Sequence, residues 1–211
     1  MSEPVVTCTD IERTYQQESV PVYALRGVDF SVQQGEFVSL SGPSGSGKST
    51  LLNIIGGLDR PNKGTVIVDG MDIGELSESE LADMRLRKIG FVFQSYNLIP
   101  VLSALENVEF IMQLQGISAQ ERRQRAQRIL ESLGIGDLGN RRPGELSGGQ
   151  QQRVAVARAI VTKPVLLLAD EPSANLDSAT TKELLELLKQ LNEEQGMTIV
   201  TATHDPMVMS Y

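Results

Sequence analysis

The sequence predicts an α/β protein whose parallel-sheet core is interrupted by a helical insertion. Three observations support this prediction. A buried strand at 35–42 runs through a glycine turn into a helix at 48–58, and a fully apolar strand lies at 164–171. The stretch between them, 95–159, is helical in pattern and more charged. Apolar strands that alternate with amphipathic helices are typical of a parallel sheet covered by helices.

Several strands are expected between residues 22 and 93, on either side of the helix that follows the glycine turn. Residues 22–36 alternate between apolar and polar side chains, which favours antiparallel strands. Two short stretches rich in β-branched or aromatic residues, 64–70 and 89–93, predict further strands. The helix is supported by a run of apolar positions: Leu51, Leu52, Ile54, Ile55 and Leu58.

The rest of the chain alternates between helical and extended patterns. Residues 119–134 predict a helix with a solvated arginine face and an apolar face that consists of Ala126, Ile129, Leu130 and Leu133. Residues 134–145 have the composition of a loop. A second helix is predicted by a leucine stripe, Leu184, Leu187, Leu188 and Leu191, and residues 197–205 predict the last strand.

Bulk composition favours one globular domain, residues 1–211, with no nucleic-acid partner. The formal charge of -8 lacks the basic excess that is usual in nucleic-acid-binding proteins. Cys8 is the only cysteine, which excludes an internal disulfide and suits a reducing compartment. The N-terminus has no basic region followed by an apolar stretch, and the apolar runs are shorter than the ~20 residues that span a bilayer.

The glycine turn carries the template G-x-x-x-x-G-K-[ST], filled by Gly42, Gly47, Lys48 and Ser49. In such a loop, backbone N–H groups point at phosphate oxygens, Lys48 reaches the terminal phosphates, and the Ser49 hydroxyl binds Mg²⁺. The following helix aims its positive end at the same place. We therefore expect a nucleoside triphosphate on Gly42, Pro43, Ser44, Gly45, Ser46, Gly47, Lys48, Ser49 and Thr50.

Two carboxylates and a histidine are expected at the same edge of the sheet. Asp170 and Glu171 end the apolar strand, and ligands of open α/β sheets bind beyond the carboxyl ends of strands. Asp170 there can hold Mg²⁺ through its water shell, and Glu171 can activate an attacking water. His204, the only histidine, follows the last strand and is expected to contact the γ-phosphate or the water. Lys48, Glu171 and His204 are the predicted catalytic residues.

Six motifs in a fixed order resemble the ABC transporter ATPase subunits. They read GPSGSGKST, VFQ, LSGGQQQR, LLLADEP, SANLD and THD, and the resemblance runs from about Ile11 to the end of the chain. It implies a P-loop NTPase fold, with a RecA-like core, an N-terminal antiparallel β subdomain and an inserted α-helical subdomain. The β subdomain and core would comprise 1–94 and 160–211, and the helical subdomain with the signature motif 95–159.

The resemblance also implies that two copies pack head to tail around two ATP molecules. The signature loop would then cap the γ-phosphate that the other copy binds, through residues that act in trans: Ser147, Gly148, Gly149, Gln150 and Asp177. Physically, the Ser147 hydroxyl can bond a phosphate, and the two glycines allow close backbone approach.

Two further residues take their expected roles from the family. Gln94 matches the glutamine that touches Mg²⁺ or water and links the core to the helical subdomain, which makes Ser49, Gln94 and Asp170 the expected Mg²⁺ site. Tyr15 lies where an aromatic ring stacks on adenine. Tyr23 is close by in sequence, and a core role for either tyrosine stays open.

Within the family, the chain most resembles the lipoprotein-release and macrolide-export ATPases, LolD-like and MacB-like. This implies an integral membrane permease as partner and a cytoplasmic location, peripheral on the inner membrane. Next to Gln94 we expect a groove for a helix of that partner, with Tyr96, Leu98, Ile99 and Leu102 exposed. The alternative is that these four residues only pack the helical insertion onto the core. Family members continue past the THD motif through another strand pair, whereas this sequence stops at HDPMVMSY.

Other classes of protein fit less well. An ABC ATPase that acts on DNA carries a long coiled coil where this chain has only 95–145, and one that acts on the ribosome carries two such domains. A small-molecule phosphotransferase would lack both the LSGGQ element and Glu171. An ABC ATPase that regulates a cell-envelope or division complex without transport remains an open alternative. The transported substrate and its direction are not encoded in this chain.

Overall fold

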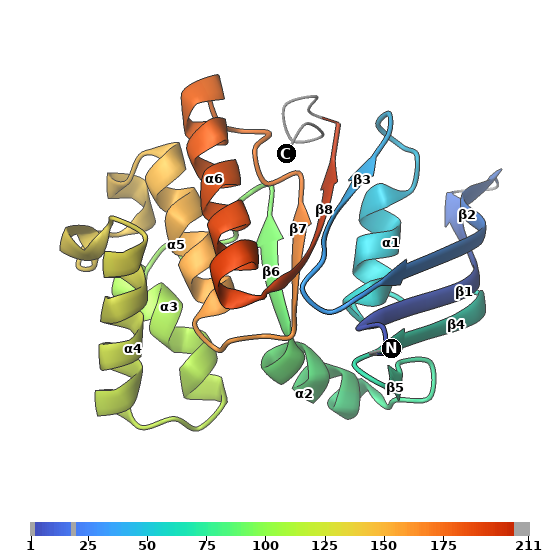
Figure 1. The fold of residues 1–211 in the computed structure, drawn as a ribbon, viewed down its shortest axis with the longest axis horizontal. Coiled ribbons are helices and arrows are strands. Elements are labelled where there is room, and N and C mark those ends of the chain that lie inside the picture. Colours follow the sequence, from blue (N-terminus) through green and yellow to red (C-terminus); the bar gives the residue numbers. More distant parts are fainter. Residues whose placement is uncertain (1–2, 18–19, 205–211) are drawn as a thin grey trace.

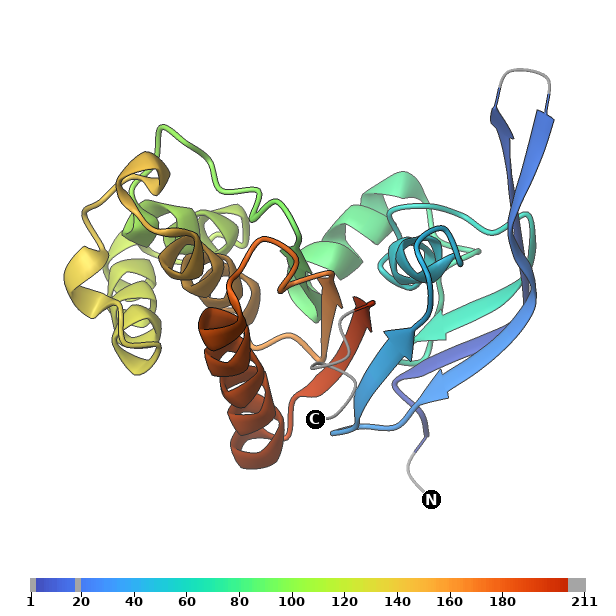
Figure 2. The same cartoon turned by 90° about the horizontal axis from the view of Figure 1, so that it is seen from above.

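Two four-stranded sheets organise the part of the chain that this computed structural model describes, residues 3–17 and 20–204 (Figure 1). The first sheet is antiparallel, with the order β2-β1-β4-β5. Its strands are β1 (Val6–Gln17), β2 (Val20–Val32), β4 (Lys63–Val68) and β5 (Met71–Asp72). The predicted N-terminal antiparallel strands are confirmed, and β1 with β2 forms a long ribbon at one end of the molecule (Figure 2).

The second sheet is parallel and has the order β3-β8-β7-β6. It consists of β3 (Phe37–Ser41), β6 (Ile89–Phe93), β7 (Leu166–Asp170) and β8 (Thr198–Thr203). All four strands therefore end at the same edge, and each is followed by a residue or loop that the sequence assigned to the nucleotide site. The predicted α/β parallel core is confirmed.

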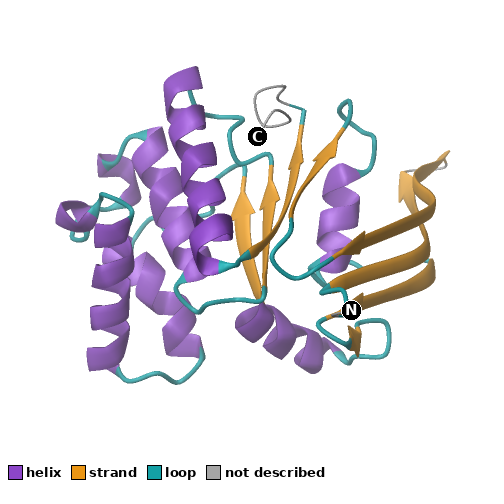
Figure 3. Cartoon of the chain, in the orientation of Figure 1, coloured by secondary structure: helices purple, strands orange, loops and turns teal. Residues whose placement is uncertain are grey.

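Helices cover both faces of the parallel sheet (Figure 3). They are α1 (Lys48–Ile55), α2 (Glu78–Lys88), α3 (Ala104–Leu114), α4 (Ala119–Ser132), α5 (Gly148–Ile160) and α6 (Ser178–Gln195). Helix α1 packs between the two sheets, and α3, α4 and α5 form a separate arm on the other side (Figure 1). The predicted loop at 134–145 contains only two short 3-10 turns, Gly136–Leu138 and Pro143–Glu145.

The parallel sheet separates two hydrophobic cores, and β7 contributes to both because successive side chains of a strand point to opposite faces. Leu167 and Ala169 pack with the helical arm and α6, whereas Leu166 and Leu168 pack with α1 and the antiparallel sheet. All four side chains are fully buried or nearly so. The phosphate-loop helix α1 and the signature helix α5 thus lie on opposite faces of one sheet.

The structure differs from the sequence prediction at two helices. Helix α1 ends at Ile55, so Leu58 is not part of its apolar stripe and is 47% exposed. Helix α2 was not predicted, since its only buried residues are Leu81 and Met84. A local signal for it does exist, because Ser77 and Glu80 form a capping box at its N-terminus. None of the described helices is long and apolar enough to span a bilayer.

Candidate functional site

The phosphate loop joins β3 to α1, and its shape depends on left-handed backbone. Gly42, Gly45 and Gly47 have φ values of 155°, 79° and 94°, which L side chains rarely adopt. Gly47 is required for a second reason besides its φ, because a Cβ there would lie 2.5 Å from the carbonyl oxygen of Ala24. Backbone of this kind is what allows successive N–H groups of a loop to point at one anion.

Lys48 and Ser49 begin helix α1 and are already held in the site. The Lys48 ammonium donates to the carbonyl oxygens of Gly42 and Pro43 at 2.8 and 3.0 Å. The Ser49 hydroxyl donates to Asp170 Oδ1 at 2.8 Å, although the two residues are 121 positions apart. The predicted meeting of the phosphate loop with the end of β7 is therefore observed.

The charged form of Asp170 is disfavoured in this site. Burial raises the pKa of its carboxyl above the ordinary value, and the charge of Glu171 acts in the same direction. The Ser49 hydrogen bond and the Lys48 charge partly offset this rise. Among the described residues, no group of three or more acidic, histidine or cysteine side chains is arranged so that it could hold a metal ion by itself. Mg²⁺ would here take one carboxylate, one hydroxyl, water and phosphate oxygens, a donor set that suits it.

Glu171 and His204 form a pair at the ends of β7 and β8. His204 Nδ1 lies 2.8 Å from Glu171 Oε1, and the His204 backbone N–H donates to Oε2 at 3.4 Å. The Glu171 backbone is left-handed at φ 47°, an uncommon state for a non-glycine residue, and its N–H donates to Ala202 O at 2.8 Å. The Glu171 side chain is only 16% exposed, so a water bound to it would be largely shielded.

The segment that follows β6 carries Gln94 and is tied to the signature helix. Asn175 donates through Nδ2 to the Gln94 carbonyl oxygen at 2.8 Å. Arg158 of α5 donates to the carbonyl oxygens of Tyr96 and Asn97, both of which have left-handed backbone. Burial lowers the pKa of Arg158, whose guanidinium donates to these backbone oxygens and pairs with no carboxylate in the described residues. The sequence analysis assigned no role to Arg158 or to Asn175, although Asn175 lies within the quoted motif SANLD.

The signature loop is capped from within its own chain. Ser147 is the N-cap of α5, its hydroxyl accepts from the Gln150 N–H at 3.3 Å, and Gln150 Oε1 accepts from the Ser147 N–H at 2.9 Å. The spacing S-x-x-Q would have predicted this capping box. The Ser147 hydroxyl keeps its own proton available for donation.

The glycines of the signature loop are required by packing as well as by any ligand. A Cβ on Gly149 would lie 2.5 Å from the Thr180 methyl, and one on Gly148 would lie 3.0 Å from the Tyr96 hydroxyl. Both glycines, which we expected to allow close backbone approach to a phosphate, are therefore also needed for packing within the chain. Thr180 also donates its N–H and hydroxyl to Asp177 at 2.9 and 3.0 Å, so Asp177 caps helix α6.

Tyr15, rather than Tyr23, is held by polar contacts near the phosphate-loop helix. Its hydroxyl donates to Asp59 Oδ2 at 2.6 Å, and the guanidinium of Arg13 lies 4.5 Å from the ring centroid. Tyr23 is 57% exposed, so neither tyrosine belongs to the hydrophobic core. Asp59 and Arg13 were also missed by the sequence analysis.

A groove of about 670 Å³ lies between α2, β6, α3 and α5. Its lining includes Ile99 and the exposed residues Leu58 and Leu114, with exposed fractions of 47% and 57%. The prediction that Tyr96, Leu98, Ile99 and Leu102 are exposed is wrong, because all four are half-buried. Leu98 packs against the core of the helical arm, which leaves Leu58 and Leu114 as the exposed apolar residues of this groove.

Residues 25–174 match the family described as ABC transporter. The chain belongs to this family. The predicted assignment to the ABC ATPase subunits is therefore confirmed, and with it the ATP-binding cassette fold and ATPase activity. The matched range includes the phosphate loop, the signature loop, Asp170 and Glu171, and it ends before Asp177 and His204.

Named relatives agree with the predicted branch of the family. The chain is 47% identical to the lipoprotein-releasing system ATP-binding protein LolD 2 of Caulobacter vibrioides, over 100% of this chain and 92% of that protein. It is 49% identical to the macrolide export ATP-binding/permease protein MacB of Syntrophobacter fumaroxidans, over 97% of this chain but 29% of that longer protein. A dimeric post-hydrolysis structure of the cassette MJ0796, bound to ADP and Pi, superposes with a TM-score of 0.89 at 48% identity. This match covers 96% of this chain and 89% of MJ0796.

Proposed function

We propose that the chain dimerises around two ATP molecules, hydrolyses them, and drives an integral membrane permease. The work would be export, lipoprotein release or another mechanical task across the envelope. The observation that carries this proposal is the convergence of Lys48, Ser49, Asp170, Glu171 and His204 at one edge of the parallel sheet. The LolD and MacB relatives support the choice of task.

Each residue at this edge has a role in the proposed reaction. Lys48 neutralises the terminal phosphates, and Ser49 with Asp170 and Gln94 holds Mg²⁺, which supplies charge neutralisation on the phosphate oxygens. Glu171 orients and deprotonates the attacking water, while His204 holds the Glu171 carboxylate at 2.8 Å. Tyr15 stacks on adenine.

The dimer is supported by where the two phosphate loops lie. Helices α1 and α5, which follow the two loops, pack on opposite faces of the sheet, so a nucleotide bound at the start of α1 would lie away from the signature loop of its own chain. A second copy in head-to-tail packing brings Ser147, Gly148, Gly149, Gln150 and Asp177 to that nucleotide, and the dimeric MJ0796 structures are consistent with such an arrangement.

The proposed permease would dock in the groove, through an amphipathic helix. Leu114 offers an exposed apolar contact there, and the segment 94–99 joins the groove to Gln94. Closure around ATP would then move the partner. Such a subunit would work at the cytoplasmic face of the membrane.

The test uses one groove variant and one matched control. Leu114→Asp should release the chain from membranes of the cells that produce it, whereas Val101→Asp, which alters a 71% exposed residue outside the groove lining, should not. ATP affinity of both purified variants should stay within about twofold, because neither residue lies near the phosphate loop. Equal membrane retention of the two variants would place the permease contact elsewhere.

A further inference from the structure

A polar bracket surrounds Tyr15. One Asp59 oxygen accepts from the Tyr15 hydroxyl at 2.6 Å, and the other pairs with Arg13 Nη2 at 2.7 Å. Arg13 in turn stacks on one face of the Tyr15 ring. The Arg13 and Asp59 side chains are only 21% and 24% exposed, so this ion pair is better shielded than an ordinary surface pair. The bracket therefore holds the ring by its hydroxyl and by one of its faces, which leaves the opposite face for a ligand to stack on.

Asp59 is itself attached to the phosphate-loop helix. Its backbone N–H donates to the Asn53 carbonyl oxygen at 3.2 Å, and Asn53 lies within α1. The Arg60 N–H donates to Asp59 Oδ1 at 2.8 Å. Lys48 thus begins α1, and the carboxylate that holds Tyr15 lies four residues beyond the other end of this helix.

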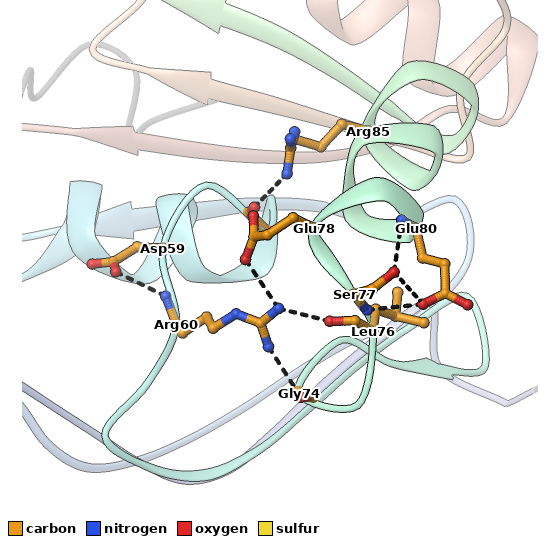
Figure 4. Close-up of polar contacts among 9 residues, drawn as sticks. Asp59, Arg60, Gly74, Leu76, Ser77, Glu78, Glu80 and Arg85 are labelled. Carbon is orange, nitrogen blue, oxygen red and sulfur yellow. Dashed lines mark hydrogen bonds and ion pairs between the residues drawn. The ribbon is translucent and has the colours of Figure 1, made fainter.

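Further hydrogen bonds and an ion pair connect the turn after α1 to its neighbours (Figure 4). Arg60 donates to the carbonyl oxygens of Gly74 and Leu76 at 3.1 and 2.6 Å, and it pairs with Glu78 at 3.2 Å. Arg85 of α2 donates to the Gly57 carbonyl oxygen at 2.6 Å. The turn between α1 and β4 is therefore fastened to the start of α2.

We propose that Asp59 is a positioning residue for the nucleobase: it holds Tyr15 and Arg13 so that the free face of the Tyr15 ring stands at a fixed distance from the phosphate loop. The inference rests on the proposed function, in which Tyr15 stacks on adenine. A stack on a ring that can rotate loses part of its binding energy to ordering the side chain, and the Asp59 bracket removes that loss. Asp59 therefore acts on the base and not on the phosphates.

The test compares ATP with inorganic tripolyphosphate, which offers the phosphates without a base. Asp59→Ala should weaken ATP binding by about tenfold and leave tripolyphosphate binding within about twofold. Tyr15→Phe, which removes only the hydroxyl, should weaken ATP binding severalfold, again without an effect on tripolyphosphate. Glu78→Gln, which loses an ion pair of the same network without touching Tyr15, should change neither affinity.

Three results would overturn the inference. Equal losses for ATP and tripolyphosphate in Asp59→Ala would mean that Asp59 only stabilises the fold. Unchanged ATP binding in Asp59→Ala would remove its positioning role, and if that variant does not fold, unchanged binding in Tyr15→Phe would do the same. Tyr15→Ala separates this failure from that of the proposed function. If its ATP affinity remains that of the wild type, the base does not stack on Tyr15, although the chain still binds ATP through its phosphate loop.

Discussion

The two glycine-rich loops of this chain use glycine for different physical reasons. In the loop at 42–47, three glycines have positive φ, and the backbone itself is shaped for an anion. In the signature loop, Gly148 and Gly149 have ordinary helical backbone and are small because Tyr96 and Thr180 lie against them. The first loop is a binding concavity, whereas the second is a packed and capped surface.

The charges around the two loops differ in the same way. Asp170, beside the first loop, has a raised pKa because it is buried near Glu171. Asp177, beside the second loop, has a lowered pKa because it accepts from the Thr180 N–H and hydroxyl. The Asp170 carboxylate is unfavourable in the first region without a cation beside it, whereas the Asp177 carboxylate is satisfied within the chain. Such a contrast is expected if the first loop binds the ligand and the second only completes another copy's site.

The largest effect is expected at the first region, from Glu171→Gln. If Glu171 deprotonates the attacking water, turnover should fall by at least about 10², because the amide accepts no proton at neutral pH. ATP affinity should stay within about threefold, and the unhydrolysed ATP should hold the dimer together in gel filtration. Hydrolysis at the wild-type rate would remove Glu171 from the mechanism.

The second prediction separates the two loops between two chains. Lys48→Ala destroys the first loop and Ser147→Arg the second, and each variant alone should be inactive. In an equimolar mixture about a quarter of all ATP sites should be intact. Half of the dimers are then mixed, and each mixed dimer has one intact site and one site with both defects. Steady-state ATPase assays of the mixture measure this directly. If the signature loop acted on its own chain's nucleotide, the mixture would stay as inactive as its components.

A third prediction tests why the signature glycine is small. Gly149→Ala should lower Tm by about 3–9 °C, since overpacking a tight contact costs about 1–3 kcal/mol. ATPase activity should fall with it, because Thr180 would be pushed away from Asp177. Adding Thr180→Ser removes the obstructing methyl and keeps the hydroxyl, so it should restore most of the loss.

Gly47→Ala provides the contrast in the first loop. Its new Cβ would meet a backbone oxygen, Ala24 O, and would sit at a φ of 94°, so no single side-chain change can relieve the strain.

The rescue by Thr180→Ser decides the prediction for Gly149. If Thr180→Ser does not rescue Gly149→Ala, Gly149 is needed only for phosphate approach.

The sequence predicts the first region much better than the second. The template around Lys48 and the apolar strand before Asp170 are local patterns, and the parallel sheet brings them together as expected. The contacts of Gly149 with Thr180 and of Arg158 with Tyr96 join segments 31 and 62 positions apart. Such pairs follow no periodicity, and a single sequence does not encode them in a readable pattern.

Burial was misjudged for a related reason. In the sequence, an apolar residue such as Leu98 looks the same whether it packs on the core of the helical arm or faces a partner protein. Only the fold distinguishes the two. Helix α2 escaped prediction because its contact with the core is limited to Leu81 and Met84, which is too few positions for a helical stripe.

The smallest expected effect tests the electrostatic contrast between Asp170 and Asp177 by the same substitution at both positions. A raised folded-state pKa means that the folded state binds the proton more tightly than the unfolded state, so Asp170 lowers the free energy of unfolding once pH rises above that pKa. At pH 7 without nucleotide, Asp170→Asn should therefore raise Tm by about 1–3 °C. The pKa of Asp177 is shifted in the opposite direction, so its charged form stabilises the fold and Asp177→Asn should lower Tm.

The pH dependence distinguishes these two causes. Lowering the pH from 7 toward the raised pKa of Asp170 protonates a growing share of its carboxyl, so the gain from Asp170→Asn should shrink. The loss from Asp177→Asn should stay constant until the pH approaches the ordinary pKa of an aspartate, because the folded-state pKa of Asp177 is lowered. Thermal unfolding over a pH series measures both trends. A loss of stability in Asp170→Asn would mean that the Ser49–Asp170 hydrogen bond outweighs the burial of the charge, and the first region would then be as well satisfied as the second.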